Sequence, residues 1–221
     1  LLGKKVAAFD TDPVNATLVG FKEFEVTCLD ILKNGDIDLN AFQHYAFLNA
    51  WNKANDGDLK AIGNTTISPI RLYSKKIASL SQIKSGDTIA VPNDASNESR
   101  ALYVLKNAGL IGLSVSGDTL ATVKDINSNP KNLVIKELDA SQTARALDSV
   151  DAAVINNNYA VTAGLKKSDA IFTEPVNKDS QQWINIIVAN KKDENNTVYK
   201  DVVKAYETEA TKKTIAKDRK S

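Results

Sequence analysis

Short apolar runs alternate with longer amphipathic segments along the chain. Runs of four to seven residues rich in Val, Ile and Ala are typical of buried strands, whereas apolar residues three or four positions apart are typical of helices. This alternation predicts an α/β fold. The predicted strands are Lys5–Phe9, Leu59–Asn64, Thr88–Val91, Val134–Glu137, Ala152–Ile155 and Trp183–Ala189. The predicted helices are Ala41–Asn55, Ser99–Ala108, Thr119–Asp125, Ser141–Leu147 and Tyr199–Lys217.

The segment Pro92–Glu98 joins a predicted strand to a predicted helix and is rich in Asn, Asp and Ser. Such side chains cap the free N–H groups at a helix start, but the same N–H groups can also hold an anion. The sequence leaves both interpretations open, simple capping or a cradle for a carboxylate. Arg100 lies just beyond, where it could clamp a carboxylate with two hydrogen bonds or form a surface ion pair with Glu98.

Two further clusters are candidates for ligand contacts. Phe42, His44 and Phe47 lie within one and a half turns of a predicted helix, where they could form the wall of an apolar pocket or belong to the core. The amides Asn156–Asn158 directly follow the apolar run Ala152–Ile155. In open α/β sheets the carboxyl ends of strands face the binding crevice, so these amides could line a ligand site or form a polar loop.

Composition narrows the classes of function. Twenty-eight Lys and Arg against 27 Asp and Glu leave a formal charge of +1, which argues against a general nucleic-acid binder. No apolar run approaches the roughly 20 residues that span a bilayer. His44 is the single histidine, and neither GxGxxG after a strand nor a P-loop motif is present. These features favour a binding protein without catalytic residues, cofactor or metal. The single cysteine, Cys28, is interpreted as a buried apolar residue.

Longer motifs are similar to those of the NlpA family of methionine-binding lipoproteins. The first is Gly35–His44, and the resemblance extends in the family's order over roughly residues 21 to 205. The further matching segments are Ile62–Thr65, Pro69, Leu72–Lys76, Ile89–Asp94, Asn97, Arg100–Leu102, Ala108–Ile111, Asn129–Leu133, Leu138–Ala140, Ala153–Asn156, Tyr159–Ala160, Ala163–Leu165 and Asn185–Ile187.

This resemblance implies a bilobal type II periplasmic-binding-protein fold, in which two α/β lobes are joined by two crossover strands. We expect residues 1–72 and 157–221 to form a discontinuous first lobe and residues 73–156 to form the second. The resemblance also implies an extracytoplasmic protein that captures methionine or a similar amino acid and delivers it to an ABC permease and its ATPase. A lipid anchor that would precede Leu1 is expected to attach it to the outer face of the membrane.

Matching motifs assign expected roles to individual residues. By resemblance, Phe42, His44 and Phe47 form the pocket wall, and Phe24 matches an aromatic residue of the family. Asn97 and Arg100 match the groups that hold the substrate carboxylate, and Asn156 and Asn185 match amides at its polar end. The sequence departs from the family where Phe47 replaces a common tyrosine, where Val26–Leu29 replaces a Pro-Asn segment, and where few residues separate the first strand from Phe21.

Three alternatives to methionine uptake stay open at this point. The same fold could bind a methionine-containing dipeptide, a D-amino acid or another apolar amino acid. The protein could be a surface interaction protein, similar to an adhesin, that does not take part in transport. An enzyme built on the same bilobal fold is the least favoured alternative, because a single histidine supplies little acid–base chemistry.

Overall fold

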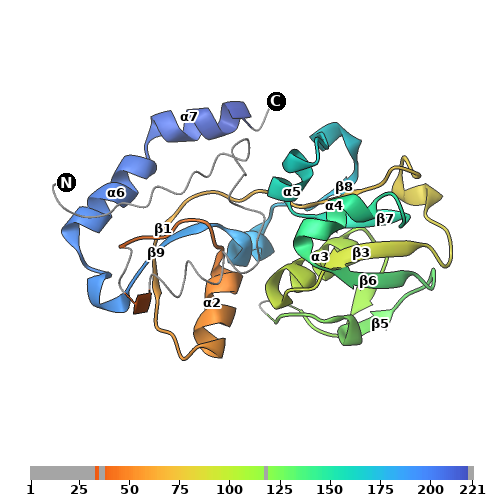
Figure 1. Ribbon diagram of the computed structural model, residues 1–221, viewed down its shortest axis with the longest axis horizontal. Coiled ribbons are helices and arrows are strands. Elements are labelled where there is room, and N and C mark those ends of the chain that lie inside the picture. The colour runs from red at the N-terminus through yellow and green to blue at the C-terminus, as the bar shows by residue number, and fades with distance from the viewer. Residues whose placement is uncertain (1–32, 35–37, 117–118, 219–221) are drawn as a thin grey trace. The chain divides into compact units, whose positions relative to one another are not determined.

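The computed structural model describes residues 33–34, 38–116 and 119–218 (Figure 1). The predicted strand Lys5–Phe9 and the residues Phe24 and Cys28 lie outside the described part of the chain. Internal contacts divide the described residues into two compact units. Unit 1 contains residues 33–67 and 181–218, and unit 2 contains residues 68–180. The lobe boundaries predicted from the sequence, after residues 72 and 156, both fall inside unit 2. Which residues move together as a lobe stays a prediction.

Unit 1 is built on a pair of antiparallel strands, β1 and β9, in which Lys60 pairs with Ala189 and Asn64 with Ile186. Helix α2 packs Leu48 and Trp51 against Ile186 and Val188 of β9. Figure 1 draws α2 and α6 on opposite sides of this strand pair. The elements of unit 1 are α2 (Tyr45–Ala54), β1 (Lys60–Asn64), β9 (Ile186–Ala189), η7 (Lys191–Asp193), α6 (Thr197–Tyr206) and α7 (Glu209–Asp218), and η6 (Lys178–Trp183) crosses from unit 2 into unit 1.

Unit 2 is built on a five-stranded mixed sheet with the strand order β6-β3-β7-β2-β8. Strand β3 runs parallel to β6 and β7, whereas β2 is antiparallel to β7 and β8. The elements of unit 2 are β2 (Arg71–Tyr73), η2 (Leu80–Gln82), β3 (Thr88–Pro92), α3 (Ala95–Asn107), β4 (Gly112–Leu113), η3 (Val123–Asp125), β5 (Ile126–Ser128), β6 (Val134–Leu138), η4 (Ala140–Gln142), α4 (Thr143–Ala146), β7 (Ala152–Ile155), α5 (Asn157–Thr162), η5 (Lys167–Asp169) and β8 (Ala170–Thr173).

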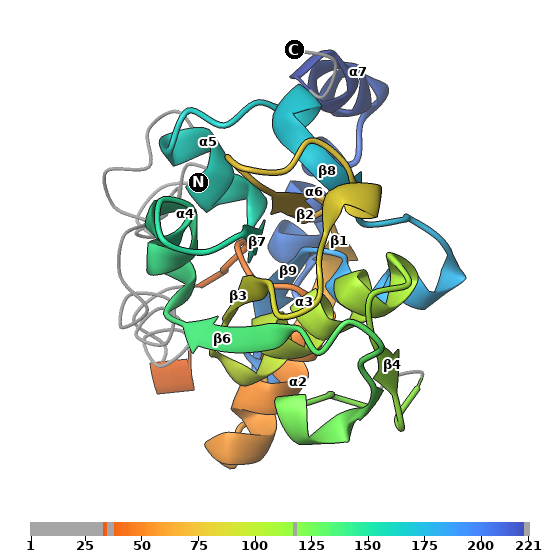
Figure 2. The same ribbon diagram turned by 90° about the vertical axis from the view of Figure 1, so that its right-hand side faces the viewer.

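Both faces of the sheet are covered at its central strand β7, which explains why β7 has an uninterrupted apolar sequence. Its residues Ala152 and Val154 join the core beneath α3, with Leu102 and Leu105 of that helix. The alternate residues Ala153 and Ile155 join a second core. That core includes Ala144 of α4 and Ala160 of α5. Figure 2 shows α3 on one side of the central strands and α4 and α5 on the other. The sheet edge where β3 and β7 end therefore leads directly into α3 and α5.

Several predicted elements have different bounds in the structure. The helix predicted over Ala41–Asn55 begins at Tyr45, because the residues before it pair with β9 and its neighbours: Asn40 bridges to Val188 and His44 to Asn185. The prediction of a helix over Thr119–Asp125 was wrong. Among its described residues only Val123–Asp125 form a short 3-10 turn, capped by Thr122. The predicted strand Trp183–Ala189 begins only at Ile186.

The predicted helix Tyr199–Lys217 is two helices, α6 and α7. The break lies at Glu207–Thr208, where the hydroxyl of Thr208 accepts a hydrogen bond from the N–H of Thr211 at 3.2 Å. This contact caps the start of α7 and supplies a partner for one of its free N–H groups. Within the described residues, no helix is both long and apolar enough to span a membrane.

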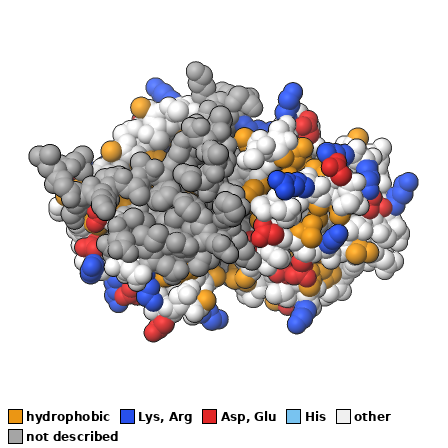
Figure 3. Space-filling model, viewed as in Figure 1, with side chains coloured by type: hydrophobic (Ala, Val, Ile, Leu, Met, Phe, Trp, Pro, Cys, Tyr) orange, Lys and Arg blue, Asp and Glu red, His pale blue; other side chains and the backbone are white. Residues whose placement is uncertain are grey.

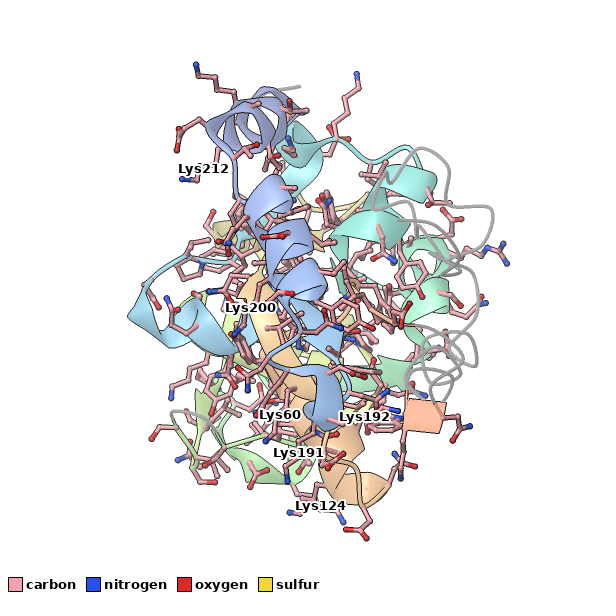
Figure 4. All side chains as sticks on the ribbon, turned by 90° about the vertical axis from the view of Figure 1, so that its left-hand side faces the viewer. Lys60, Lys124, Lys191, Lys192, Lys200 and Lys212 are labelled. Carbon is pink, nitrogen blue, oxygen red and sulfur yellow. The ribbon has the colours of Figure 1, made fainter. Side chains whose placement is uncertain are left out.

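Charges of both signs are mixed on the surface. On the face of unit 2 seen in Figure 3, Lys and Arg side chains alternate with Asp and Glu. On unit 1, the exposed lysines labelled in Figure 4 include Lys60, Lys191 and Lys200. The Nζ of Lys191 lies 3.9 Å from Oδ2 of Asp58, and the Nζ of Lys200 donates to Oδ1 of Asn195. This mixture agrees with the formal charge of +1 and gives these faces the character of a solvated surface.

Candidate functional site

The start of α3 in unit 2 is organised by Asp94. Its carboxylate caps the helix by accepting the backbone N–H of Asn97 at 3.1 Å, and it also accepts the Asn97 side-chain Nδ2 at 3.0 and 3.1 Å. The sequence left two interpretations open, capping or a cradle for a carboxylate. The structure shows capping, because the carboxylate of Asp94 accepts this N–H group. The Asn97 amide nitrogen faces Asp94, so its Oδ1 is turned away from that residue.

Asn156 continues this polar chain at the end of β7. Its Nδ2 donates to Oδ1 of Asn97 at 2.8 Å. Because Asp94 fixes the orientation of the Asn97 amide, this contact also fixes the orientation of the Asn156 amide. The Asn156 Oδ1 is buried and has no hydrogen-bond partner among the described residues. A buried acceptor without a partner costs about 1–3 kcal/mol, so this oxygen is well placed to accept from a bound donor group.

Arg100 lies one helical turn after Asn97 on α3 and is 4% exposed. Its Nε donates to Glu174 Oε1 at 2.8 Å and its Nη2 to Glu174 Oε2 at 2.6 Å. The Nη2 group also donates to the carbonyl of Ser68 at 3.0 Å. Positions three apart on a helix share a face, so Arg100 and Asn97 point the same way. Unit 2 thus places a buried guanidinium on the same helix face as Asn97, whose side chain bonds Asn156.

Glu98 is not the partner of Arg100. Its Oε1 accepts the backbone N–H of Val123 at 3.0 Å, and the residue is 7% exposed. Burial raises the pKa of the Glu98 carboxyl, and the nearby carboxylates of Glu137 and Asp94 raise it further, against the lowering effect of the Val123 hydrogen bond. Glu98 therefore tethers α3 to the following loop, and the ion pair of Arg100 is formed with a residue 74 positions away.

Unit 1 contains an aromatic cluster built from the end of η6 and the start of α2. The ring centroids of Phe42 and Phe47 are 6.2 Å apart, and those of His44 and Phe47 are 6.3 Å apart. Trp183 meets His44 edge to face at 5.3 Å. His44 and Trp183 are buried, whereas Phe42 and Phe47 are half-buried. Two phenylalanine rings therefore keep part of their surface available for an apolar group.

His44 is the N-cap residue of α2. Its Nδ1 accepts the backbone N–H of Phe47 at 3.0 Å, so this nitrogen carries no proton and the neutral imidazole carries its proton on Nε2. The backbone of His44 pairs with Asn185, whose N–H and carbonyl also bond Thr66 and Thr65 at 2.8 Å. Asn185 is thus held by its backbone, and its half-buried side chain makes no hydrogen bond with another described residue.

The structure brings the predicted site residues together in two groups. Unit 1 joins Phe42, His44, Phe47 and Asn185, and unit 2 joins Asn97, Arg100 and Asn156, while Phe24 lies outside the described residues. The sequence did not indicate Asp94 as the residue that orients the amides, Trp183 as a ring neighbour, or Glu174 as the ion-pair partner. An acidic residue two positions after the apolar run Ala170–Phe172 was the available signal for Glu174.

The sequence matches the NlpA lipoprotein family over residues 14–221. It is 43% identical over 197 residues to the probable D-methionine-binding lipoprotein MetQ of Pasteurella multocida, which covers 89% of this chain and 70% of that protein.

Solved structures give the same result. The substrate-binding protein of a methionine transporter from Streptococcus pneumoniae is 52% identical, with a TM-score of 0.79 over 86% of this chain and 76% of that one. A nutrient-binding protein from Burkholderia cenocepacia, solved bound to methionine, is 43% identical. Its TM-score is 0.80 over 87% of this chain and 80% of that one. The predicted α/β, bilobal periplasmic-binding-protein class is thereby confirmed as the fold. The chain belongs to the NlpA lipoprotein family.

Proposed function

We propose that this chain is the substrate-binding protein of an ABC importer and that its substrate is methionine. The relatives support the class: one is named as a methionine transporter's substrate-binding protein and another was solved with methionine bound. The chemistry of the described residues supports the ligand. An amino acid carries a carboxylate and an ammonium on one carbon atom, so its binding site needs a cation and a hydrogen-bond acceptor close together.

Unit 2 supplies this combination, and it is the observation on which the proposal rests. Arg100 and Asn97 share one face of α3, and Asn97 bonds Asn156, whose buried Oδ1 has no hydrogen-bond partner in the described part of the chain. Arg100 is assigned to the substrate carboxylate, and the Asn156 oxygen to the ammonium. The Asn97 amide is engaged by Asp94 and Asn156, so its contribution is to hold Asn156; its predicted direct contact with the carboxylate stays a prediction.

Unit 1 supplies groups suited to the side chain of methionine. Phe42 and Phe47 have half-buried rings, and sulfur–aromatic contacts contribute about 0.3–1.5 kcal/mol each. His44 offers its Nε2–H as a donor, and the side-chain amide of Asn185 offers both a donor and an acceptor. Because one methylene or branch changes binding by only about 1–3 kcal/mol, these contacts favour methionine over leucine without excluding it.

The family supports a lipid-anchored protein outside the cell membrane, and we include this location in the proposal. The protein would carry methionine to a permease driven by an ATPase, and no bond would be made or broken in the process. Labelling of the full-length gene product with radioactive palmitate tests the anchor. A product that stays unlabelled and in the aqueous fraction contradicts this part of the proposal without affecting the substrate.

The substrate is tested by thermal unfolding in the presence of the twenty amino acids, both enantiomers of methionine, and methionine dipeptides. A ligand at 100 times its Kd stabilises the folded state by about 2.7 kcal/mol, so the preferred ligand gives the largest rise in Tm. We expect one enantiomer of methionine to give that rise, and calorimetry then gives its affinity.

The result separates the alternatives. A larger rise with a methionine dipeptide, or with another apolar amino acid, changes the substrate and leaves the transport class intact. If no amino acid or dipeptide stabilises the protein, the binding function is wrong, and a surface interaction protein becomes the better explanation. As a site control, Arg100→Ala is compared with Arg145→Ala, because Arg145 is an exposed arginine of the same unit. Only the first substitution is expected to remove binding.

A further inference from the structure

The ion pair between Arg100 and Glu174 is buried on both sides. Each side chain is 5% exposed, and the two hydrogen bonds between them measure 2.6 and 2.8 Å. Two parallel hydrogen bonds between a guanidinium and a carboxylate fix the relative orientation of the two groups and strengthen the ion pair. Glu174 directly follows β8, whereas Arg100 lies in the second turn of α3. The pair therefore fixes a helical side chain to the edge of the sheet.

The pair is also bonded to the segment that precedes β2. Glu174 Oε2 accepts the backbone N–H of Ile70 at 3.1 Å, and the Glu174 N–H donates to the Ile70 carbonyl at 3.0 Å. Arg100 Nη2 donates to the Ser68 carbonyl at 3.0 Å. Each oxygen of Glu174 thus has a partner, and the guanidinium edge formed by Nε and Nη2 has three acceptors. These contacts leave Arg100 little freedom to change its rotamer.

We propose that Glu174 is a positioning residue for ligand binding, which acts by orienting the Arg100 guanidinium for the carboxylate of the bound amino acid. This inference rests on the proposed function. An unrestrained arginine side chain loses rotamer entropy when it is ordered, and Glu174 removes this loss from the binding step because the side chain is already fixed. Its negative charge also offsets the desolvation of the buried guanidinium.

The alternative is that Glu174 contributes to folding alone, because any broken buried ion pair destabilises a protein. The two explanations differ in which ligands are affected. A residue that acts through Arg100 affects only ligands with a carboxylate. A residue that acts only on the fold affects every ligand alike, and its effect on binding does not depend on Arg100.

The experiment compares methionine with methioninamide, in which a neutral amide replaces the carboxylate. Affinities are measured by calorimetry for the wild type, Glu174→Gln, Arg100→Ala and the double variant, and thermal unfolding checks that each is folded. Glu137→Gln is the matched control, since Glu137 is an exposed glutamate of the same sheet. Arg100→Lys replaces Arg100→Ala as the background if the latter does not fold.

We expect Glu174→Gln to weaken methionine binding about 10-fold or more, and to change methioninamide binding by less than about 3-fold. In the Arg100→Ala background, Glu174→Gln is expected to have no further effect on methionine affinity, because residues that act as a unit are not additive. Glu174→Asp keeps the charge and is expected to recover part of the affinity. Glu137→Gln is expected to bind both ligands as the wild type does.

Four results overturn the inference. Equal loss of methionine and methioninamide affinity in Glu174→Gln assigns Glu174 to folding alone, and so does an additive loss in the double variant. Unchanged methionine affinity in Glu174→Gln, together with a loss in Arg100→Ala, removes the role of Glu174 and leaves the proposed function standing. If the wild type does not bind methionine, the proposed function fails and the inference fails with it.

Discussion

Gly63 of β1 lies directly against Val203 of α6. A Cβ atom added at Gly63 would be 2.5 Å from Val203 Cγ1 and 2.9 Å from Cγ2, closer than carbon atoms approach without displacement. Val203 is 8% exposed and belongs to the buried face of α6. The absence of a side chain at position 63 therefore allows the helix to pack closely on the strand pair β1 and β9. This contact joins the C-terminal part of unit 1 to its sheet.

The first prediction follows from that contact. Gly63→Ala is expected to lower the free energy of unfolding by about 1–3 kcal/mol, because valine is stiff about χ1 and the helix or strand must shift. Urea denaturation measures the change. In a Val203→Ala background the same substitution is expected to cost less, since the clashing methyl groups are gone. An equal cost in both backgrounds would show that the clash with Val203 is not the cause.

The second prediction separates two roles of His44. The residue caps α2 through Nδ1, and its Nε2–H is assigned to the ligand site. Asparagine is a good N-cap, whereas alanine is a poor one. We therefore expect His44→Ala to be less stable than His44→Asn by about 0.5–2 kcal/mol. Methionine affinity is expected to fall in both, since both lack the imidazole. If His44→Asn binds methionine with the affinity of the wild type, the role of His44 is limited to capping.

The third prediction concerns pH and two carboxylates with opposite shifts. Burial raises the pKa of the Glu98 carboxyl in the folded protein, so protonated Glu98 stabilises the fold. This stabilisation is lost as the pH rises above the ordinary Glu value of about 4.3. Glu98→Gln keeps an acceptor for the Val123 N–H and carries no charge. It is expected to exceed the wild type in Tm at pH 7, with a difference that shrinks as the pH falls toward the ordinary Glu value of about 4.3 and stays small below it.

Asp151 provides the contrasting case. Hydrogen bonds from the Thr88 N–H and from Lys76 lower the pKa of its carboxyl, so its contribution is present at neutral pH and is lost as the pH falls. Asp151→Asn is expected to be less stable than the wild type at pH 7 and to approach it at low pH. Thermal unfolding of the three proteins from pH 3 to 7.5 measures both effects. Parallel curves for all three would contradict the assigned shifts.

The fourth prediction tests the unpartnered oxygen of Asn156. Asn156→Ala is expected to weaken methionine binding about 10- to 100-fold, as expected for a lost hydrogen bond to a charged group worth about 1.5–3 kcal/mol. Binding of 4-(methylthio)butanoate, which lacks the ammonium group, is expected to change little. The neighbouring Asn158→Ala serves as control. A similar loss for both ligands would mean that Asn156 does not accept from the ammonium.

Elements whose causes are local could be predicted from the amino-acid sequence. The apolar runs Thr88–Val91 and Ala152–Ile155 are strands, as predicted, because continuous apolar sequences require burial on both faces. Val134–Glu137 is also a strand, as predicted, although it lies at the edge of the sheet and is largely exposed. The cap at the start of α3 was also predictable, since Asp94 acts on residues only a few positions away. The family was recognisable because its motifs are long and keep their order over most of the chain.

Contacts between distant segments of the chain could not be predicted, because they depend on tertiary packing. Nothing near Arg100 in the sequence indicates Glu174 as its partner, because packing of α3 against the sheet brings the two together across 74 positions. The helix expected from Ala41 starts at Tyr45 for a related reason: pairing of Asn40 and His44 with the strand region around β9 outweighs their local helical spacing. Local propensity predicts most elements, whereas burial and long-range pairing set some of their ends and decide which polar groups meet.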